Sequence, residues 1–196
     1  MIHSLLLAVL LLQDSSSLAL RRRVWGDLAA LEQVRRADTT SVRLLADVRP
    51  ALDSMVFATS WGGAELDQLR LAFPGSPLLT RYAARRDERE GLTDAALGEI
   101  EQLVRLSPDD LELQRTRGRL LEKLNRFKEA LDAYARALDL SPEDDSSFRA
   151  LQRLSEREGA LTLLLDQIRR LRIRLPASAI LRDHEVEVSA RLGASR

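Results

Sequence analysis

The chain contains no cysteine, which excludes disulfide bonds, thiolate chemistry and metal sites with cysteine ligands. Aromatic residues make up only 4% of it, and its 30 basic and 30 acidic residues cancel. A balanced charge and few aromatic side chains argue against nucleic acid as a partner. Any electrostatic argument about function therefore has to rest on local patterns.

Histidine occurs only as His3 and His184. His184 lies between Asp183 and Glu185, and neighbouring positions of a helix point in different directions, so the three do not converge on a metal or a catalytic triad. We expect His184 to be exposed or half-packed. The acidic stretch 143–147 lacks the alternating ligands of a calcium loop. The sequence therefore predicts no catalytic residue, no metal and no cofactor, and the protein is not expected to be an enzyme.

Leucine, alanine, arginine and glutamate dominate the 196 residues, and all four favour helix over strand. Hydrophobic residues make up 45% of the chain, which is ordinary for a protein that buries a core. The composition predicts an all-α fold.

Residues 1–20 contain a wholly apolar run, Leu5–Leu12. At roughly 1.5 Å per residue this run is too short to cross a bilayer. It fits the apolar part of a secretory signal, and Ser17-Leu18-Ala19 resembles a cleavage site. Against this, no lysine or arginine precedes the run and Arg21–Arg23 follow the proposed cut. We expect an export signal, cleaved or kept as a short membrane tether, and an exported, periplasmic or membrane-anchored protein. The alternative is a start-site artefact or a helix packed on the domain of a cytoplasmic protein.

The chain resembles itself at an offset of 34 residues. The phrase "RLSPDD" at Arg105–Asp110 returns as "DLSPED" at Asp139–Asp144. Pro108, Pro142 and Pro176 fall in register, and so do Gly91, Asn125 and Gly159. A fixed period of this length is typical of stacked repeat proteins.

Each period predicts two helices, as the middle one illustrates. Leu113–Leu124 is expected to be the first helix and Phe127–Leu140 the second, with a tight turn at Asn125. Pro142 then ends the second helix. Asp144 or Asp145 can cap the next helix by accepting its free amide hydrogens. The repeated phrase is thus a helix stop followed by a helix start.

The middle period resembles a tetratricopeptide repeat, through Gly118, Phe127, Ala130, Tyr134, Ala137 and Pro142. It departs from the family pattern at Gln114, where a large aromatic residue is usual, and at Arg117, where leucine is usual. Gly118 has Ala84 and Gln152 as its counterparts in the other periods. The resemblance implies a right-handed α-solenoid of stacked helix pairs that ends in a capping helix.

The predicted organisation follows from this frame. Residues 21–76 form an N-terminal helical region with helices over Leu18–Ala37, Ser41–Phe57 (interrupted at Pro50) and Gly62–Phe73, and this region is a divergent repeat or an unrelated helical pair. Residues 77–110, 111–144 and 145–178 are three repeats, and 179–193 form the capping helix. Trp25 and Trp61 are expected to be core anchors.

Basic residues recur on one face of the first helix of each repeat. The resemblance implies that this face lines a concave groove where partner segments bind, so these residues are the predicted partner-binding site: Arg81, Arg85, Arg89, Arg115, Arg119, Lys123, Arg149, Arg153 and Arg157.

The predicted function is that of a non-catalytic interaction module for a protein or peptide, with acidic groups as ligands of the arginines. One alternative is that Glu88, Glu122 and Glu156 neutralise the basic side chains in a solvated network, where each pair contributes little. A second is a structural assembly factor of the cell envelope that uses its convex face and binds nothing in the groove.

Overall fold

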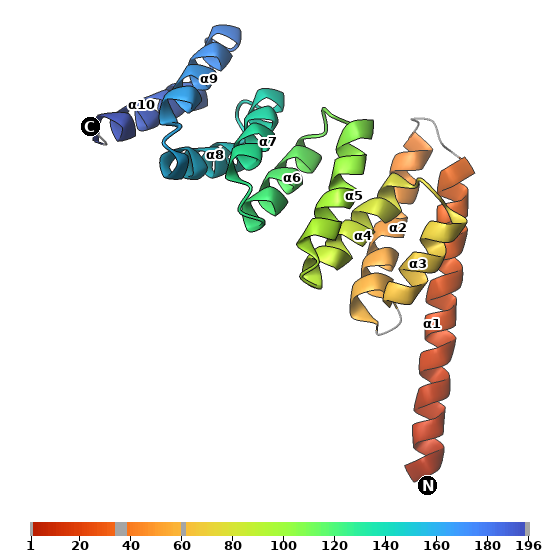
Figure 1. Cartoon of the computed structure of the whole chain (residues 1–196). Coiled ribbons are helices and arrows are strands. Elements are labelled where there is room, and N and C mark those ends of the chain that lie inside the picture. Colours follow the sequence, from red (N-terminus) through yellow and green to blue (C-terminus); the bar gives the residue numbers. More distant parts are fainter. Residues whose placement is uncertain (1, 34–38, 60–61, 195–196) are drawn as a thin grey trace. The chain divides into compact units, whose positions relative to one another are not determined.

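The computed structural model describes residues 2–33, 39–59 and 62–194, in which helices are joined by short turns and no strand occurs (Figure 1). They divide into two compact units, Met1–Arg86 and Asp87–Arg196, each of which is described by itself. The all-α prediction is confirmed for the described residues. Their helices are α1 (Ile2–Gln33), α2 (Thr39–Ala58), α3 (Gly62–Ala72), α4 (Pro77–Arg89), α5 (Thr93–Leu106), α6 (Leu111–Lys123), α7 (Phe127–Leu140), α8 (Asp145–Glu158), α9 (Leu161–Arg174) and α10 (Ala179–Ala194).

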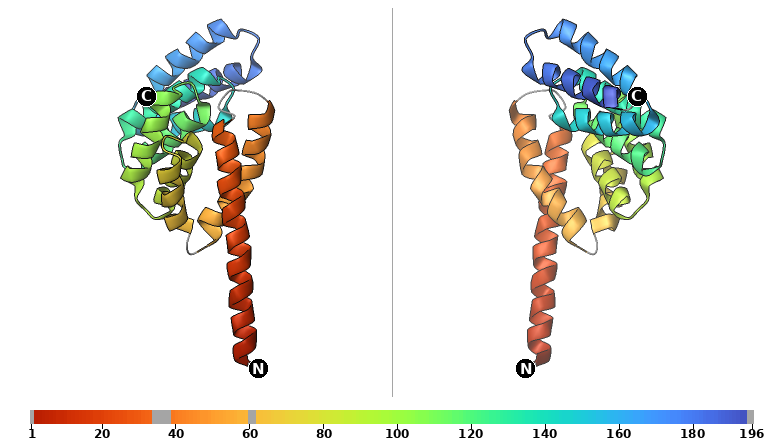
Figure 2. Two further views of the ribbon diagram at one scale, coloured as in Figure 1. Left: turned by 90° about the vertical axis from the view of Figure 1, so that its right-hand side faces the viewer. Right: turned by 90° about the vertical axis from the view of Figure 1, so that its left-hand side faces the viewer.

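In the N-terminal unit, α1 packs against α2, and α2 against α3. The apolar run Leu5–Leu12 and Trp25 lie on the same helix, because α1 begins at Ile2, well before the predicted start. The N-terminal half of α1 projects beyond the other helices of this unit in both views of Figure 2. None of the helices in the described part of the chain is long and apolar enough to cross a membrane.

The core of the N-terminal unit includes Val24, Leu28, Leu52, Met55 and Leu66, all nearly inaccessible to solvent. Trp25 packs against this core as predicted, and Trp61 lies outside the described residues.

Two further contacts fix α3 in the N-terminal unit. The Trp25 indole N–H donates to the carboxylate of Glu65 at 2.7 Å, and Arg21 pairs with the same buried carboxylate at 2.6 Å. Gly62 has no room for a side chain, since a Cβ there would lie 2.2 Å from the Met55 carbonyl oxygen. The predicted interruption of α2 is absent, and the helix continues through Pro50.

In the repeats the helix starts recur at the period found in the sequence. Second helices begin at Thr93, Phe127 and Leu161, and first helices at Pro77, Leu111 and Asp145. The capping helix α10 begins one more period on, at Ala179. Each period of the sequence therefore builds one helix pair.

The turn inside each pair is the same in all three repeats. Gly91, Asn125 and Gly159 have φ angles of 80°, 60° and 68°, the left-handed conformation that commonly ends a helix. The next amide N–H reaches back to a carbonyl five residues earlier at 2.8, 2.9 and 2.7 Å. These are the bonds from Leu92 to Asp87, from Arg126 to Leu121 and from Ala160 to Ser155.

The turns between pairs, which we call corners, also share one construction. The first corner is residues 107–110, the second 141–144 and the third 175–178. A side-chain oxygen at the last position accepts the amide N–H three residues on: Asp110 from Leu113, Asp144 from Ser147 and Ser178 from Leu181. Of the two caps that the sequence allowed after the second corner, the structure has Asp144.

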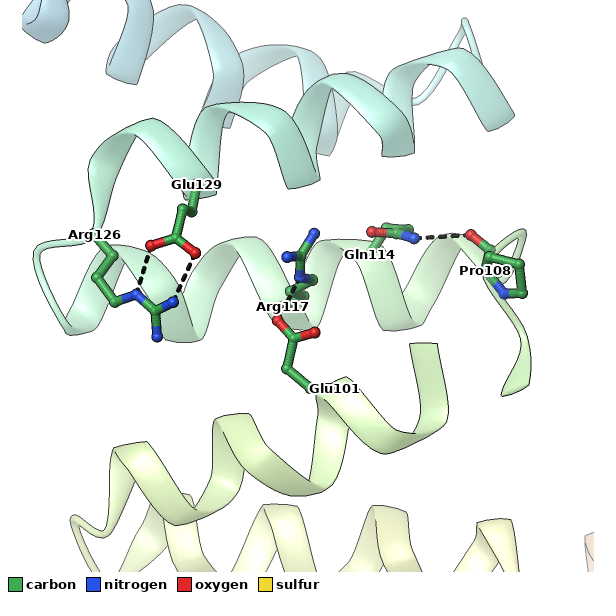
Figure 3. Close-up of polar contacts among 6 residues, drawn as sticks. All are labelled: Glu101, Pro108, Gln114, Arg117, Arg126 and Glu129. Atoms are coloured by element: carbon green, nitrogen blue, oxygen red, sulfur yellow. Dashed lines mark hydrogen bonds and ion pairs between the residues drawn. The ribbon is translucent and has the colours of Figure 1, made fainter. Parts of the chain in front are cut away.

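Polar contacts accommodate the two departures from the family pattern in α6 (Figure 3). Gln114 is buried, and its side-chain amide donates to the carbonyl of Pro108 at 2.8 Å. Arg117 donates to Glu101 of α5 at 2.7 Å, which ties the first helix of one repeat to the second helix of the repeat before. At these two positions a hydrogen bond to a backbone carbonyl and an ion pair thus replace the usual apolar contacts.

Candidate partner-binding surface

The nine predicted basic residues fall in both units. Arg81 and Arg85 belong to the N-terminal unit and the other seven to the C-terminal unit. Arg85 pairs with Asp53 at 2.8 Å, and its guanidinium lies 4.7 Å from the centre of the Phe57 ring. Arg81 and Arg89 also take part in interactions. The predicted surface is therefore described below for residues of the C-terminal unit, 87–196.

Glu88 on this face binds two bases of α6. Arg119 forks onto both of its oxygens, with one N–O distance of 2.9 Å, and Lys123 reaches it at 2.5 Å. Hydrogen bonds from Arg119 hold the pKa of Glu88 below its ordinary value, and the same contact raises the pKa of Arg119. Both groups stay charged near neutral pH.

The same pairing recurs one and two repeats further on. Arg153 donates to both oxygens of Glu122 at 2.9 Å, which is the counterpart of Arg119 on Glu88. Arg191 of the capping helix pairs with Glu156 at 2.7 Å, the counterpart of Lys123 on Glu88. Each carboxylate therefore binds a base on the helix that begins the next period, α6, α8 or α10, as the ion-pair alternative predicts. We call this set of contacts the ion ladder.

Two more of the predicted bases are engaged locally. Arg149 pairs with Asp145 one turn earlier on α8, at 2.7 Å. Arg157 lies 3.8 Å from the centre of the Phe127 ring, a cation–π contact between α8 and α7. Both side chains remain more than half exposed.

Arg115 differs from Arg119, Arg149 and Arg153, because its carboxylate neighbours are further away. Its guanidinium nitrogen lies 3.6 Å from Glu112 and 3.6 Å from Asp144, beyond hydrogen-bond distance. It lines a pocket of about 170 Å³ between α6, α7 and α8. The other lining residues are Glu112, Thr116, Arg119, Tyr134, Ser146 and Ala150.

The wall of this pocket combines charge with neutral hydroxyl groups. The Tyr134 hydroxyl donates to Glu122 at 3.4 Å. Burial, and then the nearby charge of Glu122, raise the pKa of Tyr134 to about 12, so the phenol stays neutral. The sequence analysis named Tyr134 only for the family resemblance and did not single out Thr116 or Ser146. A helical projection of α6 and of the start of α8 would have indicated Thr116 and Ser146.

The prediction for His184 is wrong. The side chain is 7% exposed, and its ring stacks on Phe148 with a centroid distance of 3.5 Å. Leu181, His184 and Val188 form the buried face of α10 at helical spacing. Among the described residues Nδ1 has no hydrogen-bond partner. Burial lowers the pKa of His184, so the ring is neutral near pH 7.

Three comparisons with known proteins place this architecture. The family model of the tetratricopeptide repeat matches residues 111–144. A search of the curated proteins found no match. Among solved structures, MamA of AMB-1 is similar with a TM-score of 0.55 at 20% identity, over 85% of this chain and 95% of that one. A MamA point variant gives 0.55 at 21% over 85% and 96%, and another MamA crystal structure gives 0.52 at 13% over 74% and 82%.

The fold defines the class: this is a right-handed α-solenoid of stacked helix pairs with a capping helix. Its middle repeat, residues 111–144, matches the family model of the tetratricopeptide repeat. The identity to the solved structures is low, so that likeness concerns the fold alone. A solenoid of this family supports the general function of a protein–protein interaction scaffold.

Proposed function

We propose that the C-terminal unit binds a segment of a partner protein in the pocket between α6, α7 and α8, and that Arg115 binds an acidic group of that segment. The observation that carries this proposal is the position of Arg115, which lines the pocket while both neighbouring carboxylates lie 3.6 Å away. A guanidinium can fork onto an incoming carboxylate with two parallel hydrogen bonds. Thr116 and Ser146 offer hydroxyl groups on the same wall.

The proposal assigns different roles to the predicted bases. Arg119 also lines the pocket, but Glu88 already holds it, so its role is to maintain the positive wall. Arg153 and Lys123 join one repeat to the next. Partner binding then depends chiefly on Arg115, and the ion ladder supplies a rigid frame around it.

The test is a selection of binders from a random peptide library displayed against the full chain, followed by calorimetry with the selected peptides. Arg115→Glu is compared with Arg149→Glu, the counterpart one repeat on, whose partner Asp145 lies on its own helix. We expect selected peptides to be rich in acidic residues. We also expect Arg115→Glu to weaken binding at least tenfold, because a charge-assisted hydrogen bond contributes roughly 1.5–3 kcal/mol. Equal losses in both variants, with unchanged circular dichroism, would remove Arg115 from the site.

A second candidate function is structural assembly through the convex face. The ion ladder favours it, because the bases that bind carboxylates of neighbouring repeats are already engaged and are not available to a ligand. Leu163 on α9 is 71% exposed. If Leu163→Ser abolishes recovery of a partner that Arg115→Glu still recovers, the convex face and not the pocket carries the function.

We propose further that residues 1–20 direct the protein to the cell envelope. The support is the apolar run Leu5–Leu12 with a small-residue site at Ser17-Leu18-Ala19. Residues Arg21 and Trp25, which hold α1 to α3, lie beyond that site and would remain after cleavage. Mass measurement of the native N-terminus together with cell fractionation tests this, and an intact cytoplasmic chain would contradict it.

A further inference from the structure

The third corner breaks the pattern of the other two. The first corner reads Ser107-Pro108-Asp109-Asp110 and the second Ser141-Pro142-Glu143-Asp144, each with two acidic residues. The third reads Leu175-Pro176-Ala177-Ser178 and has none. Ser178 keeps the capping role of the aspartates, so the fold of the corner does not require this change.

Aliphatic side chains at the third corner lie in solvent. Ile173, at the end of α9, is 81% exposed. Leu175 in the corner is 40% exposed, and Ile180 at the start of α10 is 41% exposed. Ile173 and Ile180 lie at the adjoining ends of α9 and α10, seven residues apart, with Leu175 in the corner between them. We call these three exposed side chains the apolar surface of the corner.

Several arginines flank this apolar surface along the chain. Arg169 and Arg172 both bind Glu185, on α10. By contrast, no ion pair among the described residues involves Arg170, Arg174 or Arg182. Arg170 and Arg174 share the face of α9 that carries Ile173, at spacings of three and four. Glu143 of the second corner accepts a hydrogen bond from Ser178 at 2.6 Å.

We propose that the third corner, with Arg170, Ile173, Arg174, Leu175, Ile180 and Arg182, is a docking surface for an anionic lipid membrane. Exposed aliphatic side chains flanked by cations can enter the headgroup region while the arginines bind lipid phosphates. Charge complementarity selects this partner, because the two acidic corners of the same unit would be repelled by such a surface. Each arginine near an anionic leaflet is expected to raise partitioning about fivefold.

The absence of cysteine permits a test at single positions of the full chain. Ala177→Cys places a solvent-sensitive fluorophore in the third corner, and Ser107→Cys places the same label in the first. Both labelled chains are mixed with vesicles of phosphatidylcholine, with and without phosphatidylglycerol. We expect a blue shift only for the label at 177, only with phosphatidylglycerol, and a loss of the shift at high salt.

Substitutions at the two corners supply matched controls. Arg170→Gln with Arg174→Gln should weaken partitioning about twenty-five-fold, at about fivefold for each arginine. Arg105→Gln with Leu106→Ser removes an exposed arginine and a leucine that is 70% exposed beside the acidic first corner, and should change nothing. Leu175→Ser with Ser178→Asp places the first corner's residues at these two positions and leaves position 177 for the label. It should abolish the shift while the helix content stays constant.

Three results would overturn the proposal. The chain could sediment with vesicles while the label at 177 stays in water, which would assign binding to the N-terminal apolar run. The label could respond equally to neutral vesicles, which would remove the role of the arginines. It could also respond to polyglutamate and not to any vesicle, which would make the corner a contact for acidic proteins.

Discussion

Gly118→Ala separates helix propensity from packing, because the two act in opposite directions at this position. In an exposed helix, alanine in place of glycine stabilises by about 1 kcal/mol. Here the added Cβ would lie 2.9 Å from two ring atoms of Tyr134. Real Cβ contacts are not that short, so the ring or the helix has to move. Overpacking of this kind costs about 1–3 kcal/mol. The packing cost should win, with a net loss of about 1 kcal/mol.

The measurement is thermal unfolding of the full chain followed by circular dichroism, with Gly98→Ala as control. Gly98 lies within α5, and a Cβ there would have nothing within 4 Å. We expect Gly118→Ala to lower the melting temperature by about 4 °C and Gly98→Ala to raise it. In a double-mutant cycle, Tyr134→Ile, the residue of the other two repeats at this position, should remove most of the loss. If Gly118→Ala stabilises the protein as much as Gly98→Ala, the close approach of Tyr134 to α6 is refuted.

Three further predictions concern single contacts. Burial lowers the pKa of His184, so as pH falls the unfolded chain takes up a proton near the ordinary pKa of 6.5, before the folded chain does. The contribution of His184 to stability should therefore be full above pH 6.5 and fall below it. His184→Phe should flatten this part of the pH profile of unfolding. Glu88→Gln should cost about 1 kcal/mol, and denaturant titrations at low and high salt should show the loss shrinking as salt rises. Asp144→Ala should cost about 1 kcal/mol through the lost cap of α8, with Asp145→Ala as a milder control; equal effects of the two would contradict the cap.

The repeat could be predicted from the sequence because it is encoded locally and redundantly. Proline at the corners and glycine or asparagine at the inner turns each fix a backbone conformation by themselves. Their common offset then fixes where every helix begins, so even the outer repeats could be placed. The helix α1 was harder, because its apolar run and its polar middle show no single periodicity. The contacts of Gln114 and Arg117 were unpredictable, since their partners lie on the preceding corner and helix.

The candidate site could be predicted only in part, because the relevant information lies between repeats. Helical spacing correctly placed the basic residues on the first helices. It did not show that Glu88 would accept from both Arg119 and Lys123, which depends on how far one repeat is displaced from the next. The burial of His184, by contrast, could have been predicted from the sequence. Its sequence neighbours are charged, but the spacing of Leu181, His184 and Val188 places it on the buried face of α10.

Comparison of equivalent positions separates the residues that build the solenoid from those that are free to act. Where all repeats agree, as at the inner turns and along the ion ladder, the contact made by the shared residue is structural. Arg115 and Arg149 are the same residue one period apart, yet Arg149 has a carboxylate at 2.7 Å, while Arg115 lines a pocket and has its carboxylate neighbours at 3.6 Å. The third corner loses its acidic residues while its neighbours keep theirs. Because the fold tolerates both differences without losing a cap or a turn, stability does not account for them. Each difference leaves cations with no carboxylate at hydrogen-bond distance among the described residues, namely Arg115 at the pocket and Arg170 and Arg174 at the third corner.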